Sequence, residues 1–247
     1  MRTKLSVVIP AFNEEQLLPR CLDALINQTR MADEIIIVDN NSTDRTVAIA
    51  ESYDVTILHE PLQGIGFASQ AGYTAASGDI IVRCDADTIA PADWLERIEA
   101  LFASRTESAV AVTGPGKFYD INPLLGSAMQ VTYMYAYFIL VGSALAQYPL
   151  FGSNFAMKRS AWLQIHNDTH LHRSDIHDDI DLTYHLMNIG QIVYDRSLQV
   201  GISSRPLFQA KGMHTRMLRG ITSLVIHWPS AAPWRLYRRH IRNRLNL

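Results

Sequence analysis

Short hydrophobic runs alternate with helical patterns along the first hundred residues. The apolar runs are Leu5–Ile9, Glu34–Val38, Val55–Leu58 and Asp79–Arg83. The helical patterns cover Glu15–Asn27, a segment that begins near Ser42 or Thr43, and Phe67–Ala76, and Pro91 suits the first turn of another helix. Continuous apolar strands between helices predict an α/β fold with a predominantly parallel central sheet and flanking helices. Because the first run stops at Pro10, we interpret it as a buried strand and not as a signal peptide.

Polar and small residues follow three of these strands. They are Pro10, Ala11, Asn13 and Glu14 after the first strand, Asp39 after the second, and Asp85, Ala86 and Asp87 after the fourth. Parallel sheets bind ligands at the carboxyl ends of their strands, so we expect these residues to border one binding site.

Asp85 and Asp87 lie two residues apart, so their carboxylates could share one hard cation. Mg²⁺ or Mn²⁺ suits such oxygens together with phosphate oxygens of a substrate, although this spacing is also common in solvated turns. Asp39 could bind a nucleobase or ribose, or could simply stabilise a turn. The segment from Gln63 to Ala68 precedes a helix, and its glycines would allow a phosphate to approach the helix N-terminus, although so short a glycine pattern is unspecific on its own.

Three acids begin the amphipathic run from Asp178 to Gly190. Acidic residues in the first turn of a helix complement its dipole, which is a sufficient structural reason for all three. The alternative gives Asp179 the role of a general base that takes a proton from a hydroxyl group.

Charge is distributed unevenly along the 247 residues, although the net charge is only −2. Residues 1–195 hold all 24 acidic residues and 12 of the 22 Lys and Arg, whereas residues 196–247 hold ten Lys or Arg and no acid. This basic, aromatic tail suits an anionic membrane surface, and we favour that partner over nucleic acid. Residues 121–157 carry no formal charge; we expect a packed or interfacial helix there, not a spanning one.

Histidines and cysteines give no metal-binding pattern. His166, His170, His172 and His177 lie close together in the sequence but lack the usual spacing of zinc ligands, so we do not predict zinc there. Cys21 and Cys84 are the only cysteines, which favours a reducing compartment. Hydrophobic residues make up 48% of the chain, enough for a sizeable core, which excludes a disordered protein.

Five segments together resemble the inverting family 2 glycosyltransferases of GT-A fold. They are VVIPAFNEE, VDNNSTDRT, GIGFASQAGYTAASGDIIVRCDADT, LFGSNFAMKRSAW and HDDIDLTYHLMNIG, in the order of that family, over roughly residues 4–200. The resemblance implies a GT-A, Rossmann-like catalytic domain at 1–204, with nucleotide-sugar binding in 1–115 and an acceptor part in 116–204. A basic, helical, membrane-associating extension would follow at 205–247.

The resemblance also implies roles for individual residues. Nucleotide and donor binding would fall to Pro10, Ala11, Asn13, Glu14, Asp39, Gly64, Ala68, Asp85 and Ala86. The metal, Mn²⁺ or Mg²⁺, would be held by Asp87 and Asp85, with His214 as a further candidate ligand and Arg216 near the diphosphate. Gly152, Ser153, Asn154 and Asp178 would face the donor sugar and the acceptor, and Asp179 would be the catalytic base.

These roles imply transfer of one sugar from a UDP-, GDP- or dTDP-sugar to a hydroxyl of a saccharide or lipid-linked acceptor. The Q-x-x-R-W motif of processive members is absent, because the corresponding stretch reads KGMHTR. We expect a cytoplasmic enzyme, peripheral at the inner face of the plasma membrane, that works in cell-envelope glycan or glycolipid synthesis. The alternatives are a sugar nucleotidyltransferase, whose glycine-rich loop is replaced here by PAFNEE, and a catalytically silent nucleotide-sugar binder.

Overall fold

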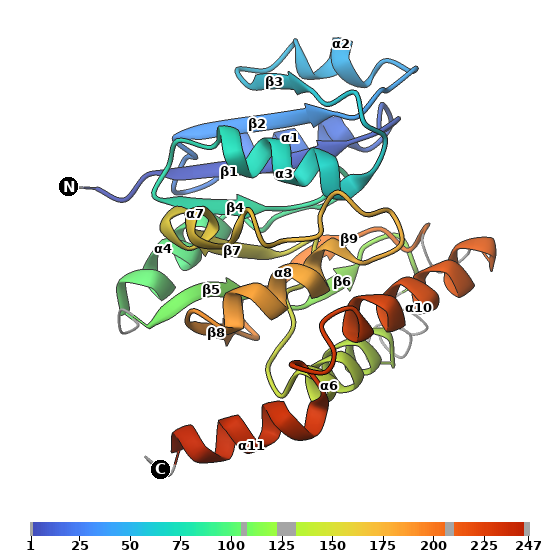
Figure 1. Ribbon diagram of the computed structural model, residues 1–247. Helices are drawn as coiled ribbons and strands as arrows, with labels where there is room; N and C mark the ends of the chain where they lie inside the picture. The colour runs from blue at the N-terminus through green and yellow to red at the C-terminus, as the bar shows by residue number, and fades with distance from the viewer. Residues whose placement is uncertain (1, 105–107, 123–131, 206–209, 245–247) are drawn as a thin grey trace.

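A seven-stranded sheet forms the centre of the computed structural model (Figure 1), which describes residues 2–104, 108–122, 132–205 and 210–244. Side chains at 210–214, 216 and 239–244 lie outside this description. The sheet order is β3-β2-β1-β4-β7-β5-β8. Its strands are β1 (Leu5–Ala11), β2 (Glu34–Asp39), β3 (Thr56–His59), β4 (Ile80–Arg83), β5 (Ala109–Thr113), β7 (Phe155–Lys158) and β8 (Gln191–Tyr194). A separate parallel pair joins β6 (Gly116–Phe118) to β9 (Val200–Ile202).

Helices cover both faces of this sheet, as the apolar runs predict. They are α1 (Leu18–Ile26), α2 (Thr46–Ala50), α3 (Ile65–Ala75), α4 (Trp94–Ser104), α7 (Arg159–Ile165) and α8 (Asp178–Met187). Near the C-terminus follow α10 (Ala210–Val225) and α11 (Pro233–Arg244), and a π-helical turn, η1 (Tyr137–Val141), runs into α6 (Gly142–Leu145). The predicted α/β architecture is therefore confirmed. Strands β1 to β4 are parallel, whereas β7 runs antiparallel to both β4 and β5.

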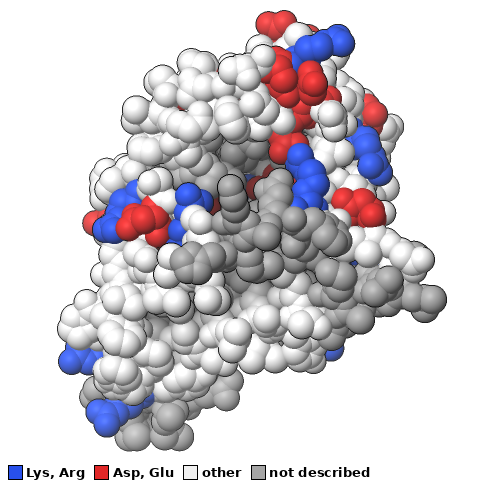
Figure 2. Space-filling view, turned by 90° about the vertical axis from the view of Figure 1, so that its right-hand side faces the viewer, with Lys and Arg blue, Asp and Glu red and all other residues white. Residues whose placement is uncertain are grey.

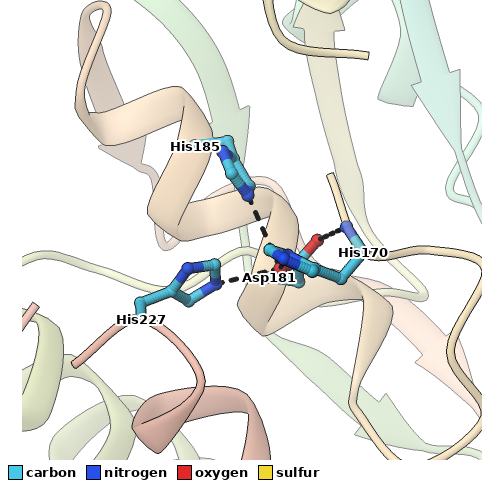
Figure 3. A group of neighbouring side chains, drawn as sticks. All are labelled: His170, Asp181, His185 and His227. Atoms are coloured by element: carbon cyan, nitrogen blue, oxygen red, sulfur yellow. Dashed lines mark hydrogen bonds and ion pairs between the residues drawn. The ribbon is translucent and has the colours of Figure 1, made fainter. Parts of the chain in front are cut away.

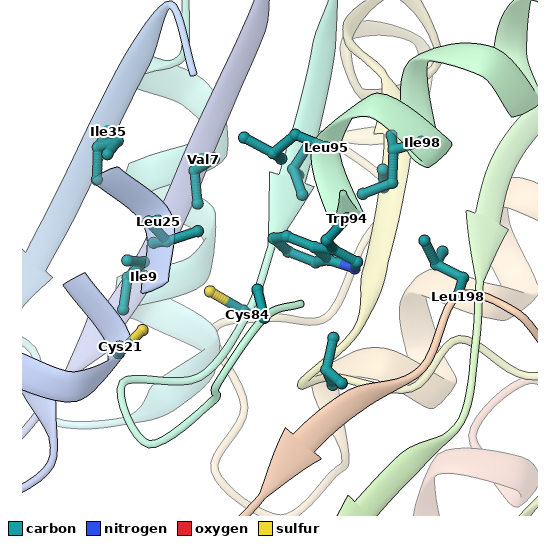
Figure 4. Close-up of a cluster of buried hydrophobic side chains, with 14 of the residues drawn as sticks. Val7, Ile9, Cys21, Leu25, Ile35, Cys84, Trp94, Leu95, Ile98 and Leu198 are labelled. Carbon is teal, nitrogen blue, oxygen red and sulfur yellow. The ribbon is translucent and has the colours of Figure 1, made fainter. Parts of the chain in front are cut away.

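Alternate residues of β1 supply the two hydrophobic cores. Val7 and Ile9 point into the core beneath α1 and α4, whereas Val8 points to the opposite face, beneath α3. The first core also contains Trp94 and the two free, buried cysteines, Cys21 and Cys84 (Figure 4). On the second face α3 lies so close to the sheet that a Cβ at Gly72 would clash with Val8 and Val38. This position therefore requires glycine.

Several helix starts differ from the sequence prediction because polar residues are used in loop contacts. The helix expected from Glu15 begins at Leu18, since the Glu15 N–H donates to Asp44 Oδ2 (3.1 Å). The helix expected near Ser42 or Thr43 begins at Thr46. The fourth helix begins at Trp94, so Pro91 precedes its first turn.

The uncharged segment forms a packed helical turn where it is described. The rings of Tyr137 and Phe138 lie against Phe151, while Ile139 and Leu140 are exposed. Within the described ranges, no helix combines the length and apolar character needed to cross a membrane. The basic tail forms α10, which packs on α8, and α11, which packs on α6 (Figure 1).

Candidate active site

The loops that follow β1 and β2 hold one another in place. The Asn13 N–H donates to Ser42 Oγ (3.0 Å), and the Thr43 N–H donates to Asn13 Oδ1 (2.7 Å). Asn13 has a φ of 54°, in the left-handed region that asparagine tolerates better than most residues. The Glu14 N–H donates to Thr46 Oγ1 (2.8 Å), which ties the same loop to the start of α2. These cross-links fix the backbone on one side of a cavity.

This nucleotide-side cavity, as we call it, has a volume of about 600 Å³ and lies at the carboxyl ends of β1 and β4, beside the start of α3. Its lining includes the predicted residues Pro10, Ala11, Asn13, Glu14, Ala68, Asp85, Ala86 and Asp87. Strands β2 and β4 lie on opposite sides of β1, so this is the crevice where open α/β sheets bind ligands. Figure 2 shows this edge of the sheet, with acidic and basic side chains gathered beside a hollow.

Two predicted nucleotide-binding residues, Asp39 and Gly64, are not part of the lining of this cavity but bond to residues beside it. Asp39 is buried; its Oδ1 accepts the Ser42 N–H (3.1 Å), and its Oδ2 lies 3.1 Å from His59 Nδ1. Gly64 is fixed by a side chain that follows β2, because its N–H donates to Asn40 Oδ1 (2.7 Å). Asn40 and Gln63, from the segments after β2 and before α3, also line the cavity.

Asp85 has charged or hydroxyl partners on both carboxylate oxygens. Its Oδ1 lies 3.0 Å from Arg83 Nη2, and its Oδ2 accepts the Ser153 hydroxyl (2.5 Å). Arg83 is fully buried and also pairs with Asp178 Oδ2 (2.8 Å). The buried guanidinium of Arg83 thus joins Asp85 to Asp178. Its charge can be buried because two carboxylates compensate it.

Asp87 faces a different cation. Its Oδ2 lies 3.0 Å from Arg205 Nη2, which also pairs with the Glu14 carboxylate (2.9 Å). Burial and the neighbouring charge of Asp85 raise the pKa of Asp87 to about 6, although Arg205 acts in the opposite direction. Because the Arg205 guanidinium is held between the Glu14 and Asp87 carboxylates, this part of the cavity attracts positive charge.

Asp179 lies in the N-terminal turn of α8, and only one of its two carboxylate oxygens has hydrogen-bond partners among the described residues. Its Oδ2 accepts the Gly152 N–H (3.2 Å) and lies 3.0 Å from the Tyr137 hydroxyl. Its Oδ1 is buried and has no hydrogen-bond partner among the described residues. Burial, with the charge of Asp178, raises the pKa of Asp179, while His177, Arg83 and Tyr137 act to lower it. A buried carboxylate of raised pKa is a stronger base than an ordinary aspartate.

A second cavity of about 260 Å³, here the catalytic cavity, contains Asp179 and adjoins the nucleotide-side cavity. The two share Ile65, Asp85 and Asp87 in their linings. The predicted residues Gly152, Ser153 and Asp178 also line it. Gly152 packs tightly here, because a Cβ would lie 3.1 Å from Arg83 Nη1 and the guanidinium would have to shift. The acid pair, Asp85 and Asp87, therefore lies at the junction of the two cavities, and Asp179 lies in the catalytic cavity.

Asn154 lines neither cavity, unlike Gly152, Ser153 and Asp178, which were predicted with it to face the donor sugar and the acceptor. It is fully buried, accepts the Trp94 indole N–H (2.9 Å) and donates to the Leu198 and Pro115 carbonyls. These contacts give Asn154 a structural reason to be present. The side chains of His214 and Arg216, the other candidates near the metal, lie outside the described residues.

Several residues of the site were not expected from the sequence. Arg205 and Arg219 line the cavities from the segment interpreted as a membrane-associating tail, and Tyr137 comes from the uncharged stretch. Arg83 lies within an apolar strand and was interpreted as part of it. The one signal in the sequence was the charge of Arg83 in an otherwise apolar strand, since a fully buried charge requires a partner.

Comparison with known proteins places this chain in a family. Residues 6–162 match the family model described as glycosyl transferase family 2. Glycosyltransferase GlyA of Streptococcus pneumoniae is 28% identical over 126 residues, which are 48% of this chain and 17% of the relative. The uncharacterized glycosyltransferase YibD of Escherichia coli is 39% identical over 89 residues, 34% of this chain and 26% of the relative. The chain thus spans well under half the length of these two relatives.

The fold has solved counterparts. Glucosyl-3-phosphoglycerate synthase of Mycobacterium tuberculosis, in a complex with Mn²⁺, UDP and glucosyl-3-phosphoglycerate, superposes with a TM-score of 0.63 at 19% identity. The match covers 90% of this chain and 80% of the synthase. At that identity the likeness shows the fold, and the family follows from the sequence model, which matches well over half of the residues. The resemblance found in the sequence is therefore confirmed: this chain belongs to glycosyl transferase family 2.

Proposed function

We propose that the protein transfers one sugar from a nucleotide-sugar donor to an acceptor hydroxyl, with inversion at the anomeric carbon. The observation that carries this proposal is the buried, unpartnered Oδ1 of Asp179, among the described residues, in a cavity that adjoins the acid pair. A transferase of this kind needs a base on the acceptor side and charge stabilisation on the leaving-group side. Asp179 would supply the base, and Asp85 and Asp87, through the metal that they would hold, would supply the charge stabilisation in the adjoining cavity.

The nucleotide-side cavity supports a nucleoside diphosphate as the donor's leaving group. The loop of Pro10, Ala11, Asn13 and Glu14 would hold the base and ribose, with Asp39 behind it. The synthase with the same fold binds UDP, which makes a uridine donor the first to test, followed by GDP- and dTDP-sugars. Gly64 and Ala68, at the start of α3, would receive the diphosphate.

The residues present fit a divalent cation at the junction. Asp87 would be its direct ligand, and Asp85, whose oxygens already contact Arg83 and Ser153, would act through water. The cation Arg205 between Glu14 and Asp87 shows that these carboxylates attract positive charge. When bound, Mn²⁺ or Mg²⁺ would neutralise charge that develops on the leaving diphosphate.

In the proposed step, the acceptor hydroxyl loses its proton to Asp179 Oδ1 as its oxygen attacks the anomeric carbon. The bond from that carbon to the diphosphate oxygen breaks with its electron pair, so no covalent enzyme intermediate forms. Gly152 and Tyr137 hold the opposite oxygen of Asp179, which keeps the carboxylate oriented. Because the hydroxyl oxygen attacks the anomeric carbon from the side opposite the leaving group, the configuration at that carbon is inverted.

The C-terminal helices support a membrane-linked acceptor. Apolar side chains stand exposed along α10, α11 and their connection, namely Met217, Leu218, Ile221, Val225, Trp228, Trp234 and Tyr237. Arg235 and Arg238 lie among them in the sequence and are exposed, a pattern suited to anionic headgroups. We infer peripheral binding at the cytoplasmic face, a lipid-linked or saccharide acceptor, a role in cell-envelope glycan synthesis, and no nucleic-acid partner. Arg205 and Arg219 would make residues 205–247 part of the site as well as a membrane anchor.

One experiment tests the function directly. The purified protein is incubated with Mn²⁺ or Mg²⁺, a panel of nucleotide sugars and anionic vesicles that contain polyprenyl phosphate, and the product is analysed by NMR. Metal-dependent transfer from one donor with inverted configuration is expected. Retained configuration contradicts single displacement. Donor binding without any transfer or hydrolysis identifies a silent binder, and synthesis of the nucleotide sugar from a sugar phosphate identifies a nucleotidyltransferase.

A further inference from the structure

Four side chains with metal-ligating atoms meet on a face of α8 that is distinct from the one bearing Asp179. They are His170, Asp181, His185 and His227, and their ligand atoms all lie within 4.8 Å of one another (Figure 3). Asp181 is two residues beyond Asp179, and residues two apart on a helix do not share a face. The cluster is therefore separate from the catalytic cavity, whose lining includes none of the four.

The cluster joins three segments that are distant in the sequence. Asp181 and His185 are one helical turn apart on α8, so they point the same way. His170 comes from the loop before α8, and His227 from the connection between α10 and α11. Of the four histidines considered from the sequence, His170 alone belongs to this group; Asp181 and His185 share one face of α8 through their i,i+4 spacing, whereas His170 and His227 reach them only through the fold.

The three imidazoles converge on one carboxylate oxygen. Asp181 Oδ1 lies 2.9 Å from His227 Nε2, 3.0 Å from His170 Nδ1 and 3.6 Å from His185 Nε2. Asp181 Oδ2 is oriented by the His170 backbone N–H (2.8 Å). Ligands about 2.0–2.1 Å from a tetrahedral ion are separated by roughly 3.3 Å, and the three distances to Asp181 Oδ1 lie close to that value.

Hydrogen bonding alone leaves this arrangement incompletely explained. At 3.6 Å, His185 Nε2 is too far from Asp181 for a hydrogen bond, and it is buried with no other partner in the described part of the chain. Asp181 is fully buried, and a carboxylate in that position requires strong compensation.

We propose that His170, Asp181, His185 and His227 bind a Zn²⁺ ion that fastens the C-terminal segment to α8. Three imidazole nitrogens with one carboxylate oxygen suit zinc, whereas Mg²⁺ and Ca²⁺ prefer sets made of oxygen. Four protein ligands would fill the tetrahedron, so the ion would be structural and not catalytic. The His170 side chain is 32% exposed, which gives the ion a route of entry.

Neighbouring contacts orient the ligands as a metal site requires. The His227 ring is stacked on Tyr184, with ring centroids 3.8 Å apart, and the Tyr184 hydroxyl lies 3.1 Å from Ser230 Oγ. The His177 N–H donates to Ser223 Oγ (2.7 Å), a second link between the start of α8 and α10. Zinc at this place would restrain α8, which carries Asp179, and α10, which carries Arg219 into the catalytic cavity.

The test uses untagged full-length protein, first freed of metal with a chelator and then given one equivalent of Zn²⁺. After desalting, elemental analysis is expected to find one zinc per chain, and the melting temperature is expected to rise by about 5 °C or more. Co²⁺ in its place should give the intense visible absorption of a tetrahedral site. Wild-type protein that retains no zinc and shows no change in melting temperature overturns the proposal, whatever the variants do.

Matched variants locate the ion. His185→Gln and His227→Gln should each abolish zinc retention and the thermal shift, whereas His166→Gln, in the same loop but outside the cluster, should leave both intact. Asp87→Asn should also retain zinc, because the donor-side carboxylates are separate. Zinc that remains in both cluster variants places the ion elsewhere and overturns the proposal.

Discussion

Arg205 Nη2 lies 3.0 Å from Asp87 Oδ2, so a residue at the start of the C-terminal extension contacts the acid proposed to bind the donor's metal. The same guanidinium pairs with Glu14 in the loop after β1. Because Arg205 is a fixed cation and metal would be a mobile one, the two compete for the same carboxylate. The extension therefore contacts the proposed donor site.

Replacing Arg205 with glutamine should strengthen binding of Mn²⁺ alone by about two- to fivefold. The gain is modest because Arg205 is partly exposed, and solvent screens its ion pairs. Calorimetric titration of Mn²⁺ without nucleotide measures it, with Arg235→Gln on α11 as the control for lost positive charge. Unchanged or weaker Mn²⁺ binding in Arg205→Gln would show that Arg205 does not compete for the metal's carboxylates.

Asp179→Asn should lower kcat at least a hundredfold, because an amide cannot accept the acceptor's proton. Donor binding, measured by calorimetry with the nucleoside diphosphate and Mn²⁺, should be unchanged, since Asp179 does not line the nucleotide-side cavity. Asp175→Asn is the control, an exposed acid in the loop just before α8. Near-normal turnover in Asp179→Asn would remove this residue from the proton transfer.

Tyr137→Phe should move the acid limb of the kcat against pH profile to higher pH. The Tyr137 hydroxyl stabilises the ionised form of Asp179 and so lowers its pKa, which burial otherwise raises. Removing the hydroxyl leaves the pKa higher, so the carboxylate becomes protonated, and activity is lost, at a higher pH. A hydroxyl has one proton, and Tyr137 also contacts the Leu150 carbonyl. An acid limb that stays or moves to lower pH means that the proton is donated to Leu150.

The sequence predicts well the position of those site residues that come soon after the end of a strand. Asp85, Asp87 and Glu14 directly follow buried strands, so the rule for parallel sheets is enough to place them at one edge. Residues that reach the site from elsewhere carry no such signal. Arg205 and Arg219 belong to a tail whose charge alone suggests a membrane, and Tyr137 belongs to an uncharged stretch.

Helix boundaries differ for a related reason. Glu15 and Asp44 have side chains or N–H groups engaged in contacts between the loops after β1 and β2, so the helices begin later than their patterns indicate. The antiparallel strand β7 was also missed, since three apolar residues followed by Lys158 reveal neither a strand nor its direction. The histidine cluster was not predicted, because His170 and His227 join the i,i+4 pair Asp181 and His185 only through tertiary packing.

Leu218→Ser with Ile221→Ser should reduce binding to anionic vesicles about tenfold. Both side chains are about half exposed on α10, at 49% and 53%, and their insertion would bury apolar surface beside Arg219. Co-sedimentation with vesicles of phosphatidylglycerol and phosphatidylcholine measures the binding, which should also weaken as salt rises. Point variants are sharper than removal of the tail, because removal would also take away His227 and Arg219 and expose the packed face of α8.

The matched control for this surface is Ile26→Ser with Met31→Ser, two similarly exposed apolar residues at and just beyond the end of α1. If membrane binding depends on the C-terminal helices, this pair should bind vesicles like the wild type. Equal loss in both double variants would mean that general surface hydrophobicity drives sedimentation. Full binding by the α10 variant would leave the exposed side chains of α10 without a role at the membrane, and the acceptor would then be sought among soluble saccharides.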